Sequence, residues 1–486
     1  MLSRCGLKRC PMASSYLFYD IETTGLNKAF DQVLEFAAIR TDHLLNEMER
    51  HTISVKLRPD VIPSPRAILT NRIPPANLAQ GMCEYEATEQ IHLLMNQPGT
   101  ISLGYNTLGF DDEFLRFSFY RNLLPPYTHQ FKNGCCRMDL FPMAVLYWLY
   151  KREVITWPEI DGKPSLKLEH IGSANRLVSG QAHEAMVDVA TTVELCRRFY
   201  KKKRMWQYLE GYFDKQTDTH RMQKLPIAFQ SGAGEHLQAI VVNGEFGPGL
   251  NYQVPVISIG NSISYSNQTL WLRMDLPQLR QTTADTIPET SWIIRKRMGE
   301  PGILLPPQDR YWNLIGQERN AVFEENLRWL EENPDIFHQI VKYYREFRYP
   351  FIPNLDPDAS LYQIGFYSRA DEKLCRMFHR DSLDQKPTRI SQFSNPNARI
   401  LAQRILSRNY PETALSEYSK AHHSYMNRIN PLRQEDAIVD YRGDRRTTPA
   451  GALREITHLK QAGGLDDHQQ QLLDDLEEYI KTQFIK

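Results

Sequence analysis

Four carboxylates stand at three separated places in the chain, and their spacing points to metal chemistry. Asp20 and Glu22 end an apolar, aromatic run, Asp111 follows a short polar segment, and Asp188 lies in an apolar stretch. Side chains on a β-strand alternate between faces, so Asp20 and Glu22 point the same way if their run is a strand. Two carboxylates on one face repel each other unless a cation lies between them, and Mg²⁺ prefers oxygen ligands.

The chemistry predicted for this set is phosphodiester hydrolysis. Two Mg²⁺ ions about 3.5–4 Å apart stabilise both the attacking and the leaving oxygen of such a displacement. A base must take a proton from the attacking water, and His183 suits because imidazole titrates near neutral pH. His183 and Asp188 are five positions apart and would not share a helix face. We therefore place His183 on a loop at a helix entry and Asp188 inside the helix.

Each feature also has a plainer interpretation when it is considered alone. The D-x-E pair could be two solvated acids before a turn. Asp111 could be an acid that favours a helix N-terminus, which is how we interpret its neighbour Asp112. His183 could be a surface or capping histidine. Asp188 is harder to explain away, because an unpaired buried aspartate is costly. The whole set in this order favours a catalytic site.

An α/β fold is needed to gather these positions, because open α/β sheets place ligands where strands end. Strands are expected at 16–22, 33–40, 53–57 and 101–106. Helices are expected at 90–96, from 110 onward, and at 138–150, 164–171 and 181–200.

A chain of 486 residues is too long for one ordinary hydrophobic core, so we expect more than one domain. After the α/β unit, the pattern of apolar and polar residues changes. A basic run at 201–204 closes the α/β unit, and we interpret it as a solvated face. Short strand candidates follow at 254–259, 270–276 and 292–295, then helices at 321–332 and 336–347. After a proline-rich link at 349–357 come polar helices that include 397–408 and 469–484. We predict a disordered or frayed end at 1–15, then units at 16–200, 204–355 and 358–486.

Composition limits the partners and the compartment. The formal net charge is +0, so nucleic-acid binding must rely on local basic surface. Seven scattered cysteines without a C-x-x-C pair argue against zinc and disulfides and favour a reducing cytoplasm. The longest apolar stretch, 140–150, contains Pro142 and is too short to cross a bilayer. We expect a cytoplasmic monomer with no membrane partner.

Two segments in which aromatic and basic residues interleave, 114–121 and 343–349, favour single-stranded nucleic acid. Aromatic stacking with cations that follow the backbone grips unpaired strands at about 1–3 kcal/mol per stacked base. For Phe117 and Phe119 we favour core packing instead.

Three motifs carry a family resemblance. D-I-E-T-T-G at 20–25, N-x-x-x-F-D at 106–111 and H-x-x-x-x-D at 183–188 resemble the motifs of ribonuclease H-like, proofreading-type 3′→5′ exonucleases with a histidine base. Further segments, among them 36–42 and 119–122, are similar to bacterial exodeoxyribonuclease I. The resemblance is dense through residue 200, thin in the β region and patchy afterwards.

This resemblance implies a fold and a site. The fold is an α/β ribonuclease H-like exonuclease domain, then an SH3-like β domain and an α-helical C-terminal domain, which enclose a groove for single-stranded DNA. Asp20, Glu22 and Asp188 are implied to hold two Mg²⁺ ions, replaceable by Mn²⁺. Asp111 completes the acidic site, and His183 is the base.

Substrate contacts are implied as well, by Glu22, Arg116, Tyr127, Phe131 and Lys167. Phe131 stands where the family can carry a tryptophan, which preserves stacking. Lys167 stands where an arginine contacts substrate, and lysine keeps the charge but loses the bidentate fork.

The implied function is Mg²⁺-dependent 3′→5′ degradation of single-stranded DNA to 5′-mononucleotides, in repair and recombination. The acidic tail of single-stranded DNA-binding protein is the expected protein partner, docking on basic surface of the first two domains. Two alternatives stay open: an RNA-directed or proofreading exonuclease of the same superfamily, and a catalytically silent single-strand-binding scaffold.

Overall fold

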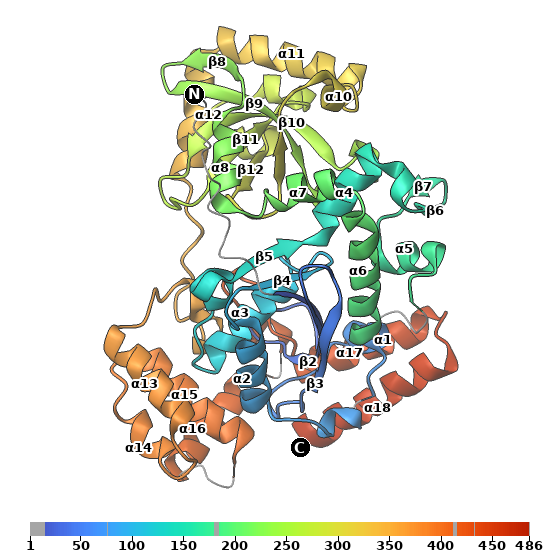
Figure 1. Ribbon diagram of the computed structural model, residues 1–486. Coiled ribbons are helices and arrows are strands. Elements are labelled where there is room, and N and C mark those ends of the chain that lie inside the picture. The colour runs from blue at the N-terminus through green and yellow to red at the C-terminus, as the bar shows by residue number, and fades with distance from the viewer. Residues whose placement is uncertain (1–14, 75, 179–183, 412–415, 432, 486) are drawn as a thin grey trace.

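The computed structural model describes residues 15–74, 76–178, 184–411, 416–431 and 433–485. The frayed end predicted at 1–15 lies outside these residues except for Ser15. Figure 1 shows a mixed sheet with helices on both sides, a β unit above it, and helices packed around its lower part. The predicted order of an α/β unit, a β unit and a helical unit is confirmed.

The first unit, which we call the exonuclease unit, is built on a five-stranded sheet in the order β3-β2-β1-β4-β5. β1 pairs antiparallel with β2 and parallel with β4. The strands are β1 (Ser15–Thr23), β2 (Val33–Thr41), β3 (Glu47–Ser54), β4 (Thr100–Gly104) and β5 (Cys136–Asp139). The edge strand β3 is more exposed than the others, as an outer antiparallel strand can be.

Helices cover both faces of this sheet because β1 is apolar on both faces. Tyr16 and Phe18 share a core with α4 and α6, whereas Leu17 and Tyr19 share another with α2 and α3. The helices are α1 (Pro65–Asn71), α2 (Glu84–Met95), α3 (Asp111–Arg121), α4 (Leu140–Tyr150), α5 (Leu168–Asn175) and α6 (Ala185–Tyr200). Phe117 and Phe119 of α3 are fully buried, which confirms them as core residues.

Several predicted bounds in this unit were wrong. The strand expected at 53–57 ends at Ser54, and the helix expected at 164–171 begins at Leu168. Residue 164 belongs instead to a short hairpin of β6 (Glu159–Ile160) and β7 (Lys163–Pro164). The helix expected at 138–150 begins two residues later, because β5 includes Met138 and Asp139. An apolar run alone does not separate a buried parallel strand from the helix that follows it.

The middle unit, which we call the β unit, holds a six-stranded antiparallel sheet in the order β12-β11-β10-β9-β13, with β8 paired to β9. Its likeness to SH3 domains stays a prediction. The strands are β8 (Ile227–Ser231), β9 (Gly234–Val242), β10 (Gln253–Asn261), β11 (Thr269–Arg273), β12 (Ile293–Lys296) and β13 (Ile303–Leu305). The helices are α7 (Lys203–Glu210), α8 (Lys215–Gln223), α9 (Ile287–Thr290), α10 (Asp309–Trp312), α11 (Gln317–Glu332) and α12 (Pro334–Glu346).

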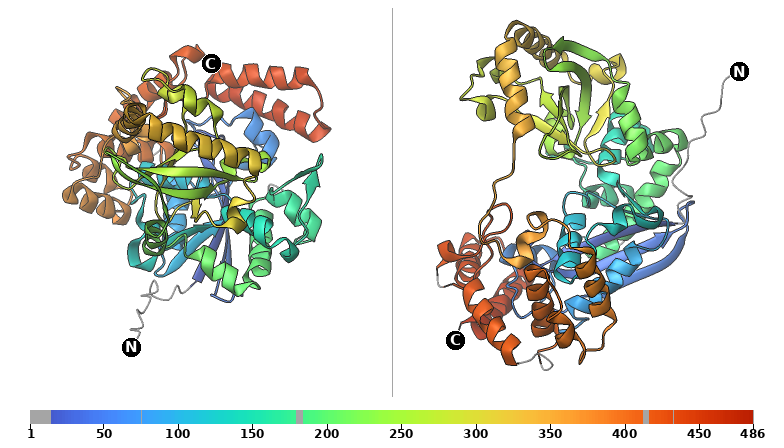
Figure 2. Two further views of the ribbon diagram at one scale, coloured as in Figure 1. Left: turned by 90° about the horizontal axis from the view of Figure 1, so that it is seen from above. Right: turned by 90° about the vertical axis from the view of Figure 1, so that its left-hand side faces the viewer.

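The C-terminal unit is helical and is reached from α12 by an extended segment, which Figure 2 shows descending past the exonuclease unit. Its helices are α13 (Arg369–Arg380), α14 (Lys386–Ile390), α15 (Pro396–Asn409), α16 (Ser416–Ile429), α17 (Pro449–Ala462) and α18 (Asp467–Phe484). Throughout the residues described, no helix combines the length and the apolar character needed to cross a bilayer.

Both later units share apolar cores with the exonuclease unit. Ile240 of β9 and Ile303 of β13 belong to the core that contains α4 and α6. The C-terminal unit packs Phe378 and Leu401 against α3, and α18 packs on α1. The basic run at 201–204 is exposed, as predicted, but α7 behind it buries Trp206 in the first core.

Candidate active site

The two carboxylates of β1 lie on one face of the strand, as its alternation requires. Asp20 and Glu22 are half-buried, whereas Ile21 between them is buried on the opposite face. In the antiparallel register Glu22 stands opposite Glu35 of β2, and a bulge follows at Thr23. This part of β1 extends beyond its pairing with β4, which is described from residue 15 to 18 of β1.

Asp111 reaches the same point from the start of α3. Its Oδ1 accepts a hydrogen bond from the backbone N–H of Ile21 at 3.3 Å, so the carboxylate sits between Asp20 and Glu22 along the strand. At the start of the helix, the backbone N–H of Asp112 donates to the Thr107 carbonyl at 3.0 Å. The helix N-terminus is thereby fixed against the end of β1.

The loop before α3 is held by Asp139, the N-cap of α4. Its carboxylate accepts hydrogen bonds from the backbone N–H groups of Asn106 at 2.8 Å and Leu108 at 3.1 Å. Gly104 is required at the end of β4, because a Cβ there would lie 2.5 Å from the carbonyl oxygen of Tyr19. These contacts set the path by which Asp111 returns to β1.

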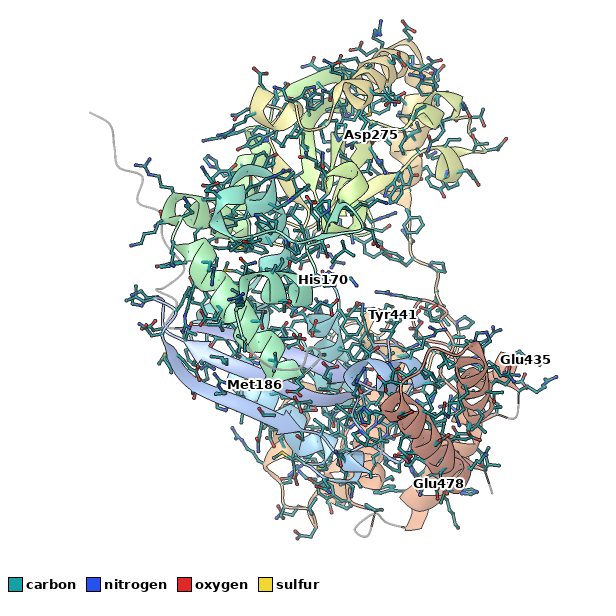
Figure 3. The ribbon with its side chains drawn as sticks, turned by 90° about the vertical axis from the view of Figure 1, so that its right-hand side faces the viewer. His170, Met186, Asp275, Glu435, Tyr441 and Glu478 are labelled. Carbon is teal, nitrogen blue, oxygen red and sulfur yellow. The ribbon has the colours of Figure 1, made fainter. Side chains whose placement is uncertain are left out.

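Asp188 lies in the first turn of α6, which packs across β1 and β2. The next residue, Val189, is buried in the core on the sheet face that carries Tyr16 and Phe18. Figure 3 shows α6, marked by Met186, lying against the sheet. The prediction that Asp188 lies inside the helix is confirmed. His183 lies outside the described residues, so its predicted place on a loop is not tested.

Burial and mutual repulsion raise the pKa values of these carboxyl groups. The pKa of Asp20 is raised well above its ordinary value, first by burial and then by the charges of Asp111, Glu22 and Asp188. Burial and the charges of Asp188 and Asp111 raise the pKa of Glu22 to about 8. Burial also raises the pKa of Asp111 to about 8, although two backbone hydrogen bonds oppose the rise.

This donor set fits a divalent cation. Carboxylate oxygens from β1, α3 and α6 are the ligands that Mg²⁺ prefers, and a cation would favour their ionised forms. Among the described side chains, no three are yet drawn together as ligands of one ion.

Sequence reasoning missed a fifth carboxylate, Glu35. Its charge adds to the rise in pKa of both Asp20 and Glu22, and its own pKa is raised by burial and by Glu184. The signal was present in the sequence, because Glu35 is the one acid in the apolar run from 33 to 39.

Comparisons with known proteins agree with this geometry. Residues 17–196 match the family described as Exonuclease, and residues 355–483 match the Exonuclease I C-terminal domain. Exodeoxyribonuclease I of Escherichia coli is 30% identical over 424 residues, which is 82% of this chain and 86% of the relative. The chain belongs to the exodeoxyribonuclease I family.

Further relatives extend the family match. Exodeoxyribonuclease I of Haemophilus influenzae is 29% identical over 388 residues, covering 74% of this chain and 78% of that protein. The solved structure of E. coli exonuclease I with a 5cy-dT13 oligonucleotide has a TM-score of 0.83 and 25% identity. That match covers 97% of this chain and 100% of the solved chain.

The side chains expected to contact substrate differ in their exposure and in their contacts. Arg116 is 8% exposed and donates to the Asp112 carboxylate, and its guanidinium lies 6.0 Å from the ring of Tyr127. Phe131 is 69% exposed. Lys167 is exposed at the N-cap of α5, 3.7 Å from Glu169. The structure thus brings Arg116 and Tyr127 together.

Asp112 proved to be more than a helix-start acid. Its buried carboxylate also accepts from His129 at 2.8 Å and from Arg137 at 2.6 Å, and Arg137 contacts Glu300 of the β unit at 2.9 Å. Arg137, Arg116 and the hydrogen bond from His129 hold the pKa of Asp112 well below its ordinary value. The network links the start of α3 to the β unit.

Proposed function

We propose that this member of the exodeoxyribonuclease I family is a Mg²⁺-dependent 3′→5′ exonuclease that degrades single-stranded DNA to 5′-mononucleotides. The observation that carries the proposal is the meeting of Asp20, Glu22, Asp111 and Asp188 around the end of β1. Family membership supports hydrolysis of DNA. Solved structures of the E. coli relative hold dT13 and dA16 oligonucleotides, which supports an unpaired strand as substrate. By family, its work belongs to repair and recombination.

Each acidic residue has a proposed role. Asp20, Glu22 and Asp188 hold the metal ions, and Asp111 completes the acidic site. Two bound Mg²⁺ ions, or Mn²⁺ in their place, would stabilise the attacking and leaving oxygens of the phosphodiester. His183 takes the proton from the attacking water. Because the site is half-buried, less water screens its charges, and these electrostatic interactions are stronger than they would be in bulk water.

A cavity next to the site supports an approach path for the strand. It has a volume of about 360 Å³ and lies between the loop before α3 and the β unit. Asn106 and Gly109 line the first side, and Arg295, Arg297 and Tyr349 line the other. Two arginines and an aromatic ring suit a backbone of phosphates with stacked bases.

Contacts nearer the scissile bond are proposed for Glu22, Arg116, Tyr127, Phe131 and Lys167. Arg116 and Tyr127 are supported by their mutual contact, and Phe131 by its exposed ring. Lys167 is exposed, as a phosphate contact requires.

One experiment separates this function from its alternatives. End-labelled single-stranded DNA, single-stranded RNA and duplex DNA are each incubated with Mg²⁺ or with a chelator. We expect rapid shortening of the DNA strand from its 3′ end with Mg²⁺ and none with the chelator. Preference for RNA would favour an RNA-directed enzyme, and binding without cleavage would favour a silent scaffold.

The acidic tail of single-stranded DNA-binding protein is the proposed protein partner. A structure of the E. coli relative is described as SSB/exonuclease I with an inhibitor. In this chain, basic and aromatic groups meet where the first two units join: Arg221 lies 4.3 Å from the rings of Tyr208 and Tyr212, and exposed Arg310 lies 4.4 Å from Tyr311. Its action as a cytoplasmic monomer stays a prediction.

A further inference from the structure

The first turn of α3 carries three consecutive acids, and each of them contacts a different part of the molecule. Asp111 accepts a hydrogen bond from the Ile21 N–H of β1, and Asp112 is linked to the β unit through Arg137. Successive side chains of an α-helix point about 100° apart, so one turn can face three neighbours. The third acid, Glu113, has no part in the chemistry proposed above.

Among the residues described, four side chains donate hydrogen bonds to the Glu113 carboxylate. The Lys28 ammonium and the Arg442 guanidinium donate to Oε2 at 2.5 and 3.2 Å. The hydroxyls of Tyr362 and Tyr441 donate to Oε1 at 3.0 and 2.8 Å. The Glu113 side chain is 14% exposed. Since both tyrosines and the arginine belong to the C-terminal unit, this carboxylate joins that unit to the start of α3.

Aromatic packing holds the two tyrosines in place. The ring of Tyr441 stacks on that of Phe117 with centroids 5.2 Å apart, and the ring of Tyr362 meets Phe117 edge-on at 5.4 Å. Phe117 is fully buried in α3. Tyr441, labelled in Figure 3, lies where the C-terminal unit borders the exonuclease unit. Because their rings are packed, the hydroxyls cannot follow Glu113, and a shift of the helix start would break these hydrogen bonds.

Lys28 extends the connection to the loop that follows β1. Its ammonium donates to the Gly109 carbonyl at 3.0 Å as well as to Glu113. Gly109 and Glu113 lie on either side of Asp111 in the chain, so Lys28 holds the segment that carries this acid from both sides. Through one carboxylate, the C-terminal unit is therefore connected to the turn of Asp111 and to the loop after β1.

We propose that Glu113 is a positioning residue for the acidic site: it ties the docked C-terminal unit to the helix turn that carries Asp111 and thereby sets the affinity for the metal ions. This role rests on the proposed function, in which Asp111 completes the site for Mg²⁺. Glu113 acts through the backbone of the helix turn and contacts neither ion nor strand. Residues that support metal ligands in this way change metal affinity by about 10–100-fold.

The test measures Mn²⁺ binding without DNA, by electron paramagnetic resonance of the free ion, so that no turnover enters the result. Tyr441→Phe keeps the ring that stacks on Phe117 and removes one donor to Glu113. We expect the dissociation constant for Mn²⁺ to rise about threefold, as loss of one hydrogen bond predicts. Glu113→Gln removes the charge that Lys28 and Arg442 contact and should raise the constant roughly tenfold.

Tyr410→Phe is the matched control. Tyr410 is also half-buried in the C-terminal unit, and its hydroxyl donates to Glu86 of α2 at 2.8 Å, the distance between Tyr441 and Glu113. We expect Tyr410→Phe to leave Mn²⁺ affinity unchanged, because α2 carries none of the proposed metal ligands. An equal loss in the two phenylalanine variants would show that docking in general sets the affinity, and the role of Glu113 would be refuted.

A second pair of variants avoids the packed rings. The Arg442 side chain is 53% exposed, so Arg442→Gln removes a donor to Glu113 and leaves the core intact. It should raise the Mn²⁺ dissociation constant about threefold. Arg445→Gln changes another exposed arginine on the same loop and should not alter it. Equal affinities in these two variants would contradict the role of Glu113.

Urea unfolding in a chelator separates positioning from stability. Lower stability with an unchanged Mn²⁺ affinity in Tyr441→Phe, Glu113→Gln and Arg442→Gln would make Glu113 a structural residue and overturn the proposal. Failure of the proposed function gives a different result, because the wild-type chain would then leave single-stranded DNA uncut with Mg²⁺. If the wild type cuts DNA and binds Mn²⁺ no more tightly than these variants, only the role of Glu113 is refuted.

Discussion

Asp111 and Asp112 are adjacent in the chain, yet their surroundings drive their pKa values in opposite directions. Burial raises the pKa of Asp111 to about 8. Asp112 is also buried, but Arg137, Arg116 and His129 keep its pKa well below the ordinary value. Without a cation the first carboxyl group favours its protonated form, whereas the second is kept ionised by the protein itself. We expect the first to serve chemistry and the second to serve structure.

A pair of matched variants tests this division. Asp111→Asn removes the cost of burying this carboxyl group and keeps an oxygen for the Ile21 N–H, so apo stability at neutral pH should rise by about 1 kcal/mol. Cleavage with Mg²⁺ should be lost. Asp112→Asn leaves buried arginines without their partner and should lower the free energy of unfolding by about 3–5 kcal/mol. Urea unfolding in a chelator measures both effects, and equal destabilisation by the two variants would contradict the assignment.

His183 is the second residue whose role can be isolated. His183→Ala should reduce turnover by about 10²–10⁴-fold, the usual contribution of a general base. Strand affinity in a chelator should be unchanged, because the imidazole acts on water rather than on the strand. Single-turnover cleavage and strand titration measure the two quantities. A parallel loss of both would assign His183 a structural role.

At the scale of elements, the sequence predicted which face of a strand or helix a side chain takes, but not which residues pair across neighbouring strands. Alternation along β1 placed Asp20 and Glu22 on one face, and helical spacing placed Asp188 inside α6. Glu35 could not be placed the same way, because its position opposite Glu22 depends on the antiparallel register of β2. Local patterns determine which face a side chain takes, whereas pairing between strands determines its neighbours.

The register of β2 gives Glu35 a testable role. Its charge acts on Asp20 and Glu22, so Glu35→Gln should weaken the attraction for Mg²⁺. We expect the Mg²⁺ concentration for half-maximal cleavage to rise about tenfold, as for other residues that support metal ligands, with little loss of rate at saturating Mg²⁺. Gln keeps the size of the side chain, so the β1–β2 pairing should survive. An unchanged Mg²⁺ dependence would show that Glu35 does not act on the ions.

At the scale of the whole molecule, a buried ionic network joins the exonuclease and C-terminal units. Arg408 of α15 contacts Asp60 at 2.9 Å and Asp358 at 2.5 Å, and Arg58 contacts Asp60 at 3.1 Å. Arg404 contacts Asp356 at 2.6 Å. No sequence pattern predicted this network, because Arg408 and its partners come close in space only after the two units have docked. Charge spacing along the chain carries no information about such pairs.

Acid should weaken this docking. Arginines hold the pKa values of Asp60 and Asp358 below their ordinary values, so both groups bind protons more readily in the unfolded chain. The stability that they contribute is complete above the ordinary carboxyl pKa of about 3.9 and is lost as the pH falls below it. The crowded carboxyls of the metal site act in the opposite sense, so wild-type stability alone does not isolate the network.

Asp60→Asn isolates it by difference. At neutral pH this variant leaves Arg58 and Arg408 short of a partner, and we expect its free energy of unfolding to be about 3–5 kcal/mol below wild type. Below a pH of about 4 the unfolded wild-type chain takes up a proton at Asp60, whereas the folded chain keeps this group ionised, so the difference should shrink as the pH falls. Urea unfolding at several pH values measures this difference, and the metal-site carboxyls cancel because both chains carry them. A difference that stays constant into acid would mean that the ionised Asp60 does not hold the two units together.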